Sequence, residues 1–389
     1  MARRTTIEVG LPEPCVSTPE TRMPGDASDP AAGCVVHSWN EWDPLEEVVV
    51  GRLEGAAAPP AHVTMVGNLP ARAARLYPLL AGRRYPRLLV KPAQRELDGF
   101  VRMLAAAGIT VRRPDVVDFS RRFASPHWRS NGFCTASPRD GILVIGDELI
   151  ETPMAWRSRY FETHAYRTLL KEYWARGARW VSAPKPELLD ALYERDFVPP
   201  AKGEAVRYII NEFEPVFDAA DFVRCGTDLF VTRSNATNRA GIEWLRRHLG
   251  PRFRIHEVRS RCPQPLHIDT TFMPLAPGKV LVNPEYVDVD DLPAVLRSWD
   301  VLVAPEPDPI AGWRNLHLSM VSKWISMNVL MLDRERVVVE ASQTSMMRLL
   351  ERHGFVPVPC PFMNYKPFGG SFHCATLDVR RRGTLESYF

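Results

Sequence analysis

Residues 341–359 read ASQTSMMRLLERHGFVPVP, and this stretch carries the pattern that decides the fold. Segment 341–354 predicts an amphipathic helix that ends at a glycine. The short apolar run 355–358 then predicts a strand, which Pro359 closes. The stretch therefore predicts one structural unit, a helix followed by a strand.

Four similar units precede it along the chain. Their helix and strand ranges are 96–108 with 109–111, 157–177 with 179–181, 240–250 with 253–255, and 292–299 with 301–303. Within the second helix Phe161, Ala165, Leu169 and Tyr173 recur every four residues, which predicts a buried stripe. Further strands are predicted at 45–50, 142–145, 229–232, 279–282 and 329–332.

Five such units, without a nucleotide-type glycine fingerprint, indicate a repeated α/β architecture. A doubly wound parallel sheet is the alternative that the pattern leaves open. We favour fivefold repetition because the units fill the chain from about residue 36 onward and leave no linker. Segment 36–389 is therefore expected to form a single domain.

The composition excludes several classes of protein. The chain has 389 residues, of which 45% are hydrophobic and 24% charged, as in globular proteins. A net charge of +3 predicts no nucleic-acid partner, and no apolar run approaches the roughly 18 residues of a membrane-spanning helix. Residues 1–35 contain five prolines and no periodicity, which predicts a flexible tail, and residues 1–10 lack the apolar core of a secretory signal.

The cysteines argue for a reducing compartment. Their number is odd and no two form a CxxC pair, so we expect neither a disulfide framework nor a zinc ribbon. A cytoplasmic location is expected instead. The seven are Cys15, Cys34, Cys134, Cys225, Cys262, Cys360 and Cys374.

The segment 369–376, GGSFHCAT, is the most pointed candidate for chemistry. Two glycines before Cys374 allow a tight bend and close approach to a ligand. The run Arg380-Arg381-Arg382 would favour a thiolate by raising the local positive potential. A buried, inert thiol is the alternative for Cys374, as it is for most free cysteines.

Two further segments carry acids and a histidine. In an extended segment His267 and Asp269 would point to one face and could serve a nucleophile and a cationic substrate together, although a surface H-x-D pair is the commoner case. Asp218, in FDAADF at 217–222, suits the orienting carboxylate of a triad or a helix N-cap. A turn accounts for Asp140. No second cluster with ligand spacing accompanies these residues, so we expect neither a metal nor a cofactor.

Several stretches of the chain resemble the amidinotransferase family, of the glycine and inosamine-phosphate amidinotransferase type. They are FDAADF at 217–222, HIDTTF at 267–272, GSFHC at 370–374, NEWDPLEE at 40–47, PMAWRSR at 153–159 and DVRRRGTL at 378–385. The resemblance covers about residues 36–389. It implies a five-bladed α/β propeller with pseudo-five-fold symmetry, a central site and a homodimer.

The resemblance also implies roles for individual residues. Cys374 would be the nucleophile, His267 the general acid and base, and Asp218 the carboxylate that orients His267. Asp140 and Asp269 would grip the guanidinium of the donor. The implied partners are small molecules, a guanidino donor such as arginine and a primary amine acceptor, with an amidino-cysteine intermediate.

Some positions depart from the family pattern. Tyr286 stands where the family usually places an arginine that holds the donor carboxylate; Ser322 matches a family serine, and Val321 replaces another. Gln264 and Leu266 differ from the glycine enzyme near the acceptor. These departures favour a larger amine than glycine and a role in natural-product biosynthesis. The alternatives are a guanidine hydrolase of the arginine deiminase type and glycine amidinotransferase itself.

Overall fold

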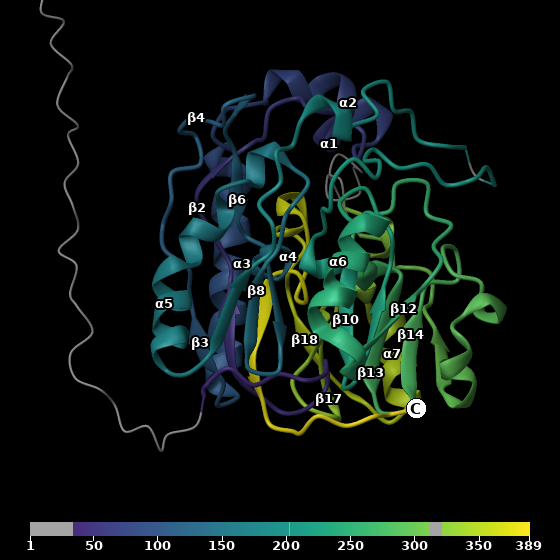
Figure 1. The fold of residues 1–389 in the computed structure, drawn as a ribbon. Helices are drawn as coiled ribbons and strands as arrows, with labels where there is room; N and C mark the ends of the chain where they lie inside the picture. Colours follow the sequence, from purple (N-terminus) through teal and green to yellow (C-terminus); the bar gives the residue numbers. More distant parts are fainter. Residues whose placement is uncertain (1–33, 202, 311–320) are drawn as a thin grey trace, which may run out of the picture. The chain divides into compact units, whose positions relative to one another are not determined.

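The computed structural model describes residues 34–201, 203–310 and 321–389, so the predicted tail lies almost entirely outside the described residues. The described chain is a mixed α/β structure (Figure 1). Within it, five three-stranded sheets share one pattern: the first two strands are antiparallel, and the third is parallel to the second.

Each of four sheets is built from consecutive chain, a hairpin followed by a helix and the third strand. The first comprises β7 (Ile142–Ile145), β8 (Glu148–Glu151), α5 (Arg167–Ala175) and β9 (Arg179–Ser182). The helix provides the crossover that a parallel pair of strands requires. The others comprise β10 (Phe222–Cys225), β11 (Asp228–Val231), α6 (Arg239–Leu249) and β12 (Arg254–Glu257); β13 (Phe272–Ala276), β14 (Lys279–Val282), η9 (Ala294–Ser298) and β15 (Asp300–Val303); and β16 (Leu330–Met331), β17 (Arg336–Glu340), α7 (Thr344–Arg352) and β18 (Val356–Cys360).

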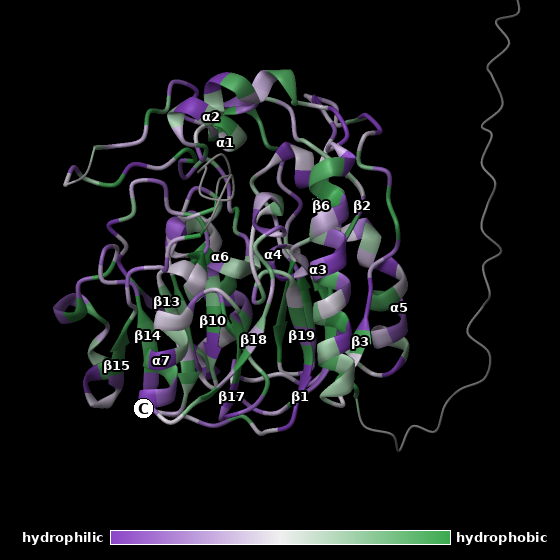
Figure 2. Ribbon diagram, turned by 180° about the vertical axis from the view of Figure 1, so that it is seen from behind, coloured by the Kyte–Doolittle hydropathy of each residue, from purple (hydrophilic) through white to green (hydrophobic). Residues whose placement is uncertain are grey.

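The fifth sheet joins the two ends of the ordered chain. Strand β19 (Thr376–Arg381) pairs antiparallel with β1 (Leu45–Val50), which pairs in parallel with β3 (Thr110–Arg112) after α3 (Arg87–Ala106). Figure 2 shows β19 beside β1. Smaller elements follow β1: β2 (Arg52–Ala57) pairs with β6 (Phe133–Thr135), β4 (Phe123–Ala124) pairs with β5 (Arg129–Ser130), and α1 (Val63–Val66) and α2 (Ala71–Leu76) precede α3.

A glycine at the hairpin turn shows how the sequence specifies these sheets. Ile145 pairs with Glu148, so Gly146 and Asp147 form a two-residue turn, and Gly146 has a φ of +62°. A Cβ at Gly146 would lie 2.0 Å from the indole of Trp39. Glycine is therefore required both by the backbone and by the packing.

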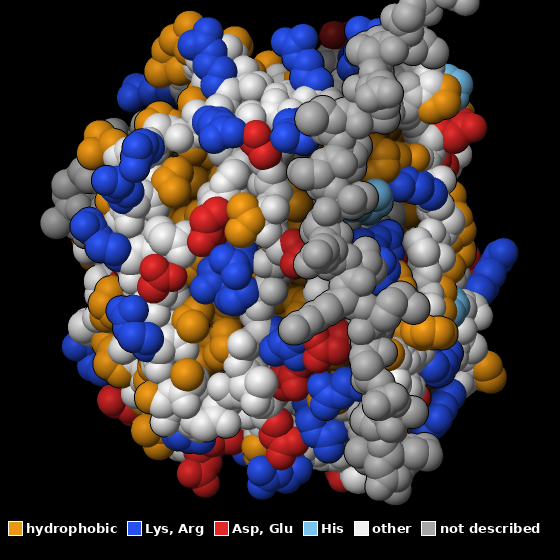
Figure 3. Space-filling model, turned by 90° about the vertical axis from the view of Figure 1, so that its left-hand side faces the viewer, with side chains coloured by type: hydrophobic (Ala, Val, Ile, Leu, Met, Phe, Trp, Pro, Cys, Tyr) orange, Lys and Arg blue, Asp and Glu red, His pale blue; other side chains and the backbone are white. Residues whose placement is uncertain are grey.

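Apolar side chains of the strands and helices form the core, seen as green strands in Figure 2. Helix α5, for example, buries Leu169, Leu170 and Tyr173 in one cluster with Leu149 of β8. Each such side chain contributes roughly 1.5–3 kcal/mol relative to exposure. On the side that carries α5, basic and acidic side chains are interspersed over the surface (Figure 3).

Three predicted helices differ from those observed. Helix α3 begins nine residues earlier than the predicted segment 96–108. Segment 157–177 is not one helix: η2 (Arg157–Arg159) and η3 (Glu162–Tyr166) precede α5, because Arg159 turns inward to Glu162 and Asp140. Of its predicted stripe, Phe161 is only half-buried and the other three residues are buried. Segment 292–299 forms only the short 3-10 helix η9, which Pro293 begins.

The six cysteines of the described chain are free thiols. No helix in residues 34–201, 203–310 or 321–389 has both the length and the apolar character needed to cross a membrane.

Candidate active site

All five sheets contribute to one buried cluster of polar side chains. Each contributing residue lies within four positions of the strand that begins its sheet. They are Asp140 before β7, Asp218 before β10, Asp269 before β13, Asn328 before β16 and Cys374 before β19. Sheet repetition thus brings together residues that are up to 234 positions apart in the chain, as the hydrogen bond between Arg139 and the His373 carbonyl illustrates.

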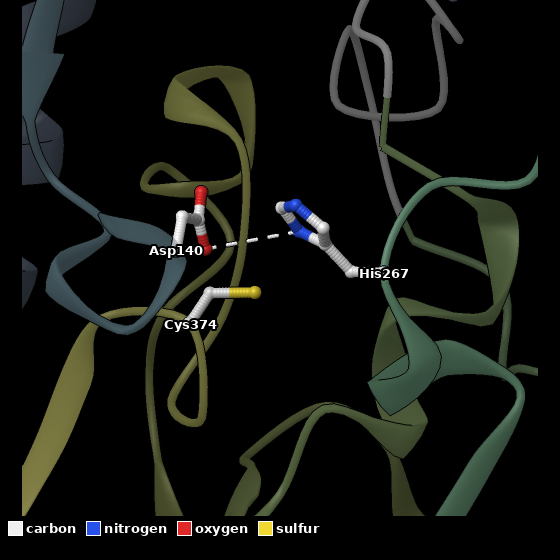
Figure 4. A group of neighbouring side chains, drawn as sticks. All are labelled: Asp140, His267 and Cys374. Carbon is white, nitrogen blue, oxygen red and sulfur yellow. Dashed lines mark ion pairs between the residues drawn. The ribbon is translucent and has the colours of Figure 1, made fainter. Parts of the chain in front are cut away.

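Cys374, His267 and Asp140 face one another at the centre of this cluster (Figure 4). One ligand atom from each, the sulfur, a ring nitrogen and a carboxylate oxygen, all lie within 4.8 Å of one another. Nε2 of His267 lies 3.1 Å from Oδ2 of Asp218, and Nδ1 lies 3.8 Å from Oδ1 of Asp140. Cys374, His267 and Asp218 thus offer a thiol, an imidazole and a carboxylate in the arrangement that a nucleophile, a base and an orienting acid require.

The loop that carries Cys374 depends on a glycine. A Cβ at Gly370 would lie 2.4 Å from the Cβ of Cys374 and 2.9 Å from its sulfur. The close approach expected from the glycines before Cys374 is therefore present, here between the loop and the cysteine itself.

Arg159 ties two of the acids together. Its guanidinium donates to Oδ2 of Asp140 at 2.8 Å, forms two hydrogen bonds with Glu162, and lies 3.5 Å from Oδ2 of Asp218. The remaining Oδ1 atoms of Asp140 and Asp218 are buried and have no hydrogen-bond partner among the described residues. Buried acceptors of this kind cost free energy unless a donor reaches them, so both suit a ligand rich in N–H groups.

Asp269 lies on the other side of the sulfur. The Cys374 thiol donates to Oδ2 of Asp269 at 3.1 Å, and the same oxygen lies 3.0 Å from Nδ1 of His373. Nε2 of His373 lies 3.4 Å from Glu41, which Arg224 contacts at 2.8 Å. A chain of buried polar contacts thus leads from the sulfur into the core.

The electrostatics of the site favour a neutral thiol in the absence of a ligand. Burial raises the pKa of Cys374 to about 12, and the negative charges of Asp269 and Asp140 add to this effect. Burial alone would lower the pKa of His267, but Asp140 and the hydrogen bond to Asp218 outweigh it and raise that pKa well above its usual value. Both shifts therefore favour the protonated forms of the thiol and the imidazole.

Two expectations from the sequence are wrong in detail. The arginine run does not favour the thiolate, because Arg380 and Arg382 pair with Glu46 and Arg381 pairs with Asp378. His267 and Asp269 are not in an extended segment: His267 has a φ of +62° and precedes the 3-10 helix η7 (Ile268–Thr270). The side chain of Asp218 makes no capping hydrogen bond, so the helix N-cap interpretation does not hold. A turn does not account for Asp140 either, because its carboxylate accepts a hydrogen bond from Arg159.

Four of the predicted substrate-binding residues line a cavity and are not part of the buried polar cluster. Gln264, Leu266, Tyr286 and Ser322 line a cavity of about 950 Å³, together with Val321, and Cys374 does not line it. The cavity reaches Leu266 and Thr270, which flank His267 and Asp269 in the chain. The hydroxyl of Tyr286 lies 3.4 Å from that of Ser322, and Gln264 donates to the carbonyl of Gly67 at 2.6 Å.

Three residues of the cluster were not identified from the sequence: Arg159, Asn328 and His373. Arg159 stands in the family-like stretch 153–159 and His373 in GSFHC, so the resemblance marked both segments without assigning either residue. Asn328 precedes a predicted strand and carries no sequence signal of its own. Its Nδ2 donates to the Cys374 sulfur at 3.0 Å.

Asp140, His267 and Cys374 could also hold a metal ion, which the sequence analysis did not foresee. Oxygen, nitrogen and sulfur ligands together suit a soft divalent cation such as Zn²⁺. The same three atoms face the reacting centre, so a bound cation would compete with a covalent role for Cys374.

A buried thiol, an imidazole and several acids thus meet in front of the five sheets, an arrangement that suits a cysteine nucleophile and a cationic ligand. No protein-family model matches the chain. The L-arginine:L-lysine amidinotransferase of Pseudomonas savastanoi pv. phaseolicola is 48% identical over 354 residues, covering 91% of this chain and 96% of that relative.

Two solved structures are also similar. SxtG, an amidinotransferase of the saxitoxin biosynthetic pathway from Microseira wollei, is 54% identical with a TM-score of 0.88, covering 92% of this chain and 100% of that one. The inosamine-phosphate amidinotransferase StrB1 from Streptomyces griseus is 41% identical with a TM-score of 0.82, covering 91% and 99%. The chain belongs to the amidinotransferase family, and it is a transferase of amidino groups.

Proposed function

We propose that this enzyme moves the amidino group of arginine, or of a related guanidino donor, to a primary amine through an amidino-Cys374 intermediate. The observation that carries the proposal is the position of the Cys374 sulfur, in one pocket of acids with the His267 imidazole. The unpartnered oxygens of Asp140 and Asp218 and the hydrogen bonds around Asp269 suit a guanidinium held over the sulfur. Fixing the donor in this way contributes roughly 7–11 kcal/mol in well-oriented reactions.

The first half-reaction follows from the charges. A cationic donor beside Cys374 lowers the thiol pKa, and the thiol proton passes to water that the entering donor displaces. The thiolate attacks the central guanidinium carbon, forming a C–S bond. The C–N bond to the departing amine breaks, and its electron pair takes the proton of the His267 imidazolium.

The second half-reaction reverses these steps with another amine. The acceptor nitrogen attacks the thiouronium carbon while neutral His267 takes its proton, and the C–S bond breaks to return the thiolate. Water in place of the amine would yield hydrolysis, so burial of Cys374, which is 2% exposed, protects the intermediate.

Acceptor choice belongs to the neighbouring cavity. Gln264 and Leu266, at the positions expected near the acceptor, line a space larger than glycine needs, which supports a bulkier amine; Tyr286 and Ser322, at the positions expected near the donor carboxylate, line the same space. The amidinotransferases SxtG and StrB1 support a natural-product pathway as the setting.

We also infer the wider organisation. The five sheets would be the blades of an α/β propeller with pseudo-five-fold symmetry, which the pairing of β19 with β1 supports. Segment 36–389 would be one catalytic domain of a cytoplasmic homodimer that binds neither nucleic acid nor membrane. Sedimentation of the purified enzyme tests the dimer.

The decisive experiment supplies arginine with a panel of amines and aminocyclitols. Ornithine and a new guanidino product are expected only when an acceptor is present, and intact-mass analysis with arginine alone should show an adduct that Cys374→Ala lacks. Steady release of citrulline from arginine alone would instead identify a hydrolase.

A further inference from the structure

Asn328 is the one sheet-leading residue of the cluster to which neither the sequence nor the proposed mechanism assigns a task. It lies two positions before β16, as Cys374 does before β19, and its side chain is buried. A buried amide must satisfy both of its ends, so its partners show its orientation.

The orientation of the Asn328 amide is determined by backbone groups. Its Oδ1 accepts from the backbone N–H of His373 at 2.9 Å and from that of Cys374 at 3.2 Å. Two N–H donors can face only the oxygen of the amide, so Nδ2 must point the other way. It points at the Cys374 sulfur, 3.0 Å away.

The charges around the sulfur give this contact a purpose. Asp269 lies 3.1 Å from the sulfur and Asp140 lies nearby, and both oppose a negative charge there. Amide N–H groups stabilise an anion, and hydrogen bonds to charged groups are the stronger ones. The amide N–H of Asn328 is therefore a neutral hydrogen-bond donor that favours the thiolate, although it lies next to the acids proposed to bind the guanidino substrate.

We propose that Asn328 is a catalytic residue of this enzyme, whose amide donates to the Cys374 sulfur and stabilises the thiolate that attacks the donor. The proposal rests on the nucleophilic role of Cys374 given above. When the C–S bond forms, the sulfur loses its charge and the hydrogen bond weakens. When the bond breaks in the second half-reaction, the same N–H meets the returning thiolate.

The test uses two substitutions. Asn328→Asp keeps an oxygen for the two backbone N–H groups but adds a negative charge near the sulfur, whereas Asn328→Ser removes the amide donor without adding a charge and is therefore the variant that decides. Alkylation of Cys374 by iodoacetamide is followed against pH without any substrate. Hydrogen bonds to charged groups are worth about 1.5–3 kcal/mol, so the rate at a given pH should fall about 10- to 100-fold. An unchanged pH profile would overturn the proposal.

Asn238→Asp is the matched control. Oδ1 of Asn238 also accepts from two backbone N–H groups, of Val216 and Gly241, and its Nδ2 donates to backbone carbonyls, but it caps α6. It should lower the unfolding temperature like Asn328→Asp while leaving the alkylation profile as in the parent enzyme. Equal slowing of alkylation in both variants would reduce Asn328 to a structural residue.

A second comparison separates a role at the sulfur from a role in donor binding. In a Cys374→Ala background the sulfur is absent, so Asn328→Asp should not weaken arginine binding measured by calorimetry. Weaker binding there would show that Asn328 acts on the site as a whole and would contradict the proposal. If Asn328→Asp does not fold, the pH profile of iodoacetamide alkylation is measured on Asn328→Ser alone, which also lacks the amide donor. Because alkylation needs no transfer reaction, its outcome is distinct from that of the ornithine assay.

Discussion

The thiol of Cys374 donates a hydrogen bond to Oδ2 of Asp269 at 3.1 Å, so the nucleophile and a predicted guanidinium ligand are in contact before any substrate enters. A carboxylate in this position has two opposing effects. It attracts the cationic donor, and it raises the pKa of the thiol that must ionise. We expect the donor to resolve this conflict, because a positive charge bound between the sulfur and the carboxylate would stabilise both anions.

The substitution Asp269→Asn should therefore separate the two effects. Removing the negative charge lowers the thiol pKa, so iodoacetamide should alkylate Cys374 about 10-fold faster at mildly alkaline pH, since one pKa unit is a tenfold change. Adduct formation with arginine should fall at the same time because the donor loses a ligand. Asp118→Asn, at a surface carboxylate that pairs with Arg84, is the control for both assays. Slower alkylation of Asp269→Asn would contradict this account.

The pKa of His267 predicts the pH dependence of the first half-reaction. His267 must be protonated to deliver its proton. Its raised pKa keeps the imidazole protonated at pH values where an ordinary histidine is neutral. Ornithine release in a single turnover should thus decline only as the pH rises through this raised value. Asp218→Asn removes a hydrogen bond that raises the pKa, so the decline should move to lower pH, and the maximal rate should fall about 10²- to 10⁴-fold with the loss of acid catalysis. A decline that stays in place would exclude Asp218 as the partner of His267.

His373 is expected to position Asp269. Its Nδ1 faces Asp269 and its Nε2 faces Glu41. Asparagine places its amide near Nδ1 and glutamine near Nε2, so His373→Asn keeps the contact with Asp269 and His373→Gln loses it. We expect His373→Gln to raise the KM for arginine about 10-fold or more, as the loss of a hydrogen bond to a charged group does. His373→Asn should stay within a few-fold of the parent enzyme; equal KM values for the two variants would refute a positioning role.

A soft divalent cation should inhibit the enzyme. The ligand atoms of Asp140, His267 and Cys374 lie close enough to share one ion, and Zn²⁺ there would occupy the sulfur. Added Zn²⁺ should block both iodoacetamide alkylation and ornithine release, and EDTA should restore them. Exhaustive chelation of the purified enzyme should leave its activity unchanged or raise it. Loss of activity on chelation, restored by one metal, would instead reveal a metal enzyme.

Many of the helices and of the third strands of the sheets were predictable from the sequence, because each shows its own periodicity. Strands β7 and β14 lie at the predicted residues, helix α7 lies within its predicted range, and helix α6 begins one residue before its own. The hairpin partners were missed, although Gly146-Asp147 and Gly226-Thr227 are turn signals between them. Strands such as β8 and β10 carry Glu148, Glu151 and Arg224 in buried positions, which hides their apolar pattern.

The sequence by itself indicated the candidate set, a cysteine after two glycines, an H-x-D pair and isolated aspartates, and the resemblance to the amidinotransferase family added their expected roles. Only the tertiary structure decided how those groups are charged and oriented. It placed Arg224 against Glu41 and Asp378, left the arginine run away from the sulfur, and set Asn328 and His373 beside the site. The reason is physical: a residue's type and neighbours in the chain determine its local conformation, whereas pKa values and hydrogen-bond partners depend on groups that only the packing of five sheets brings within a few ångströms.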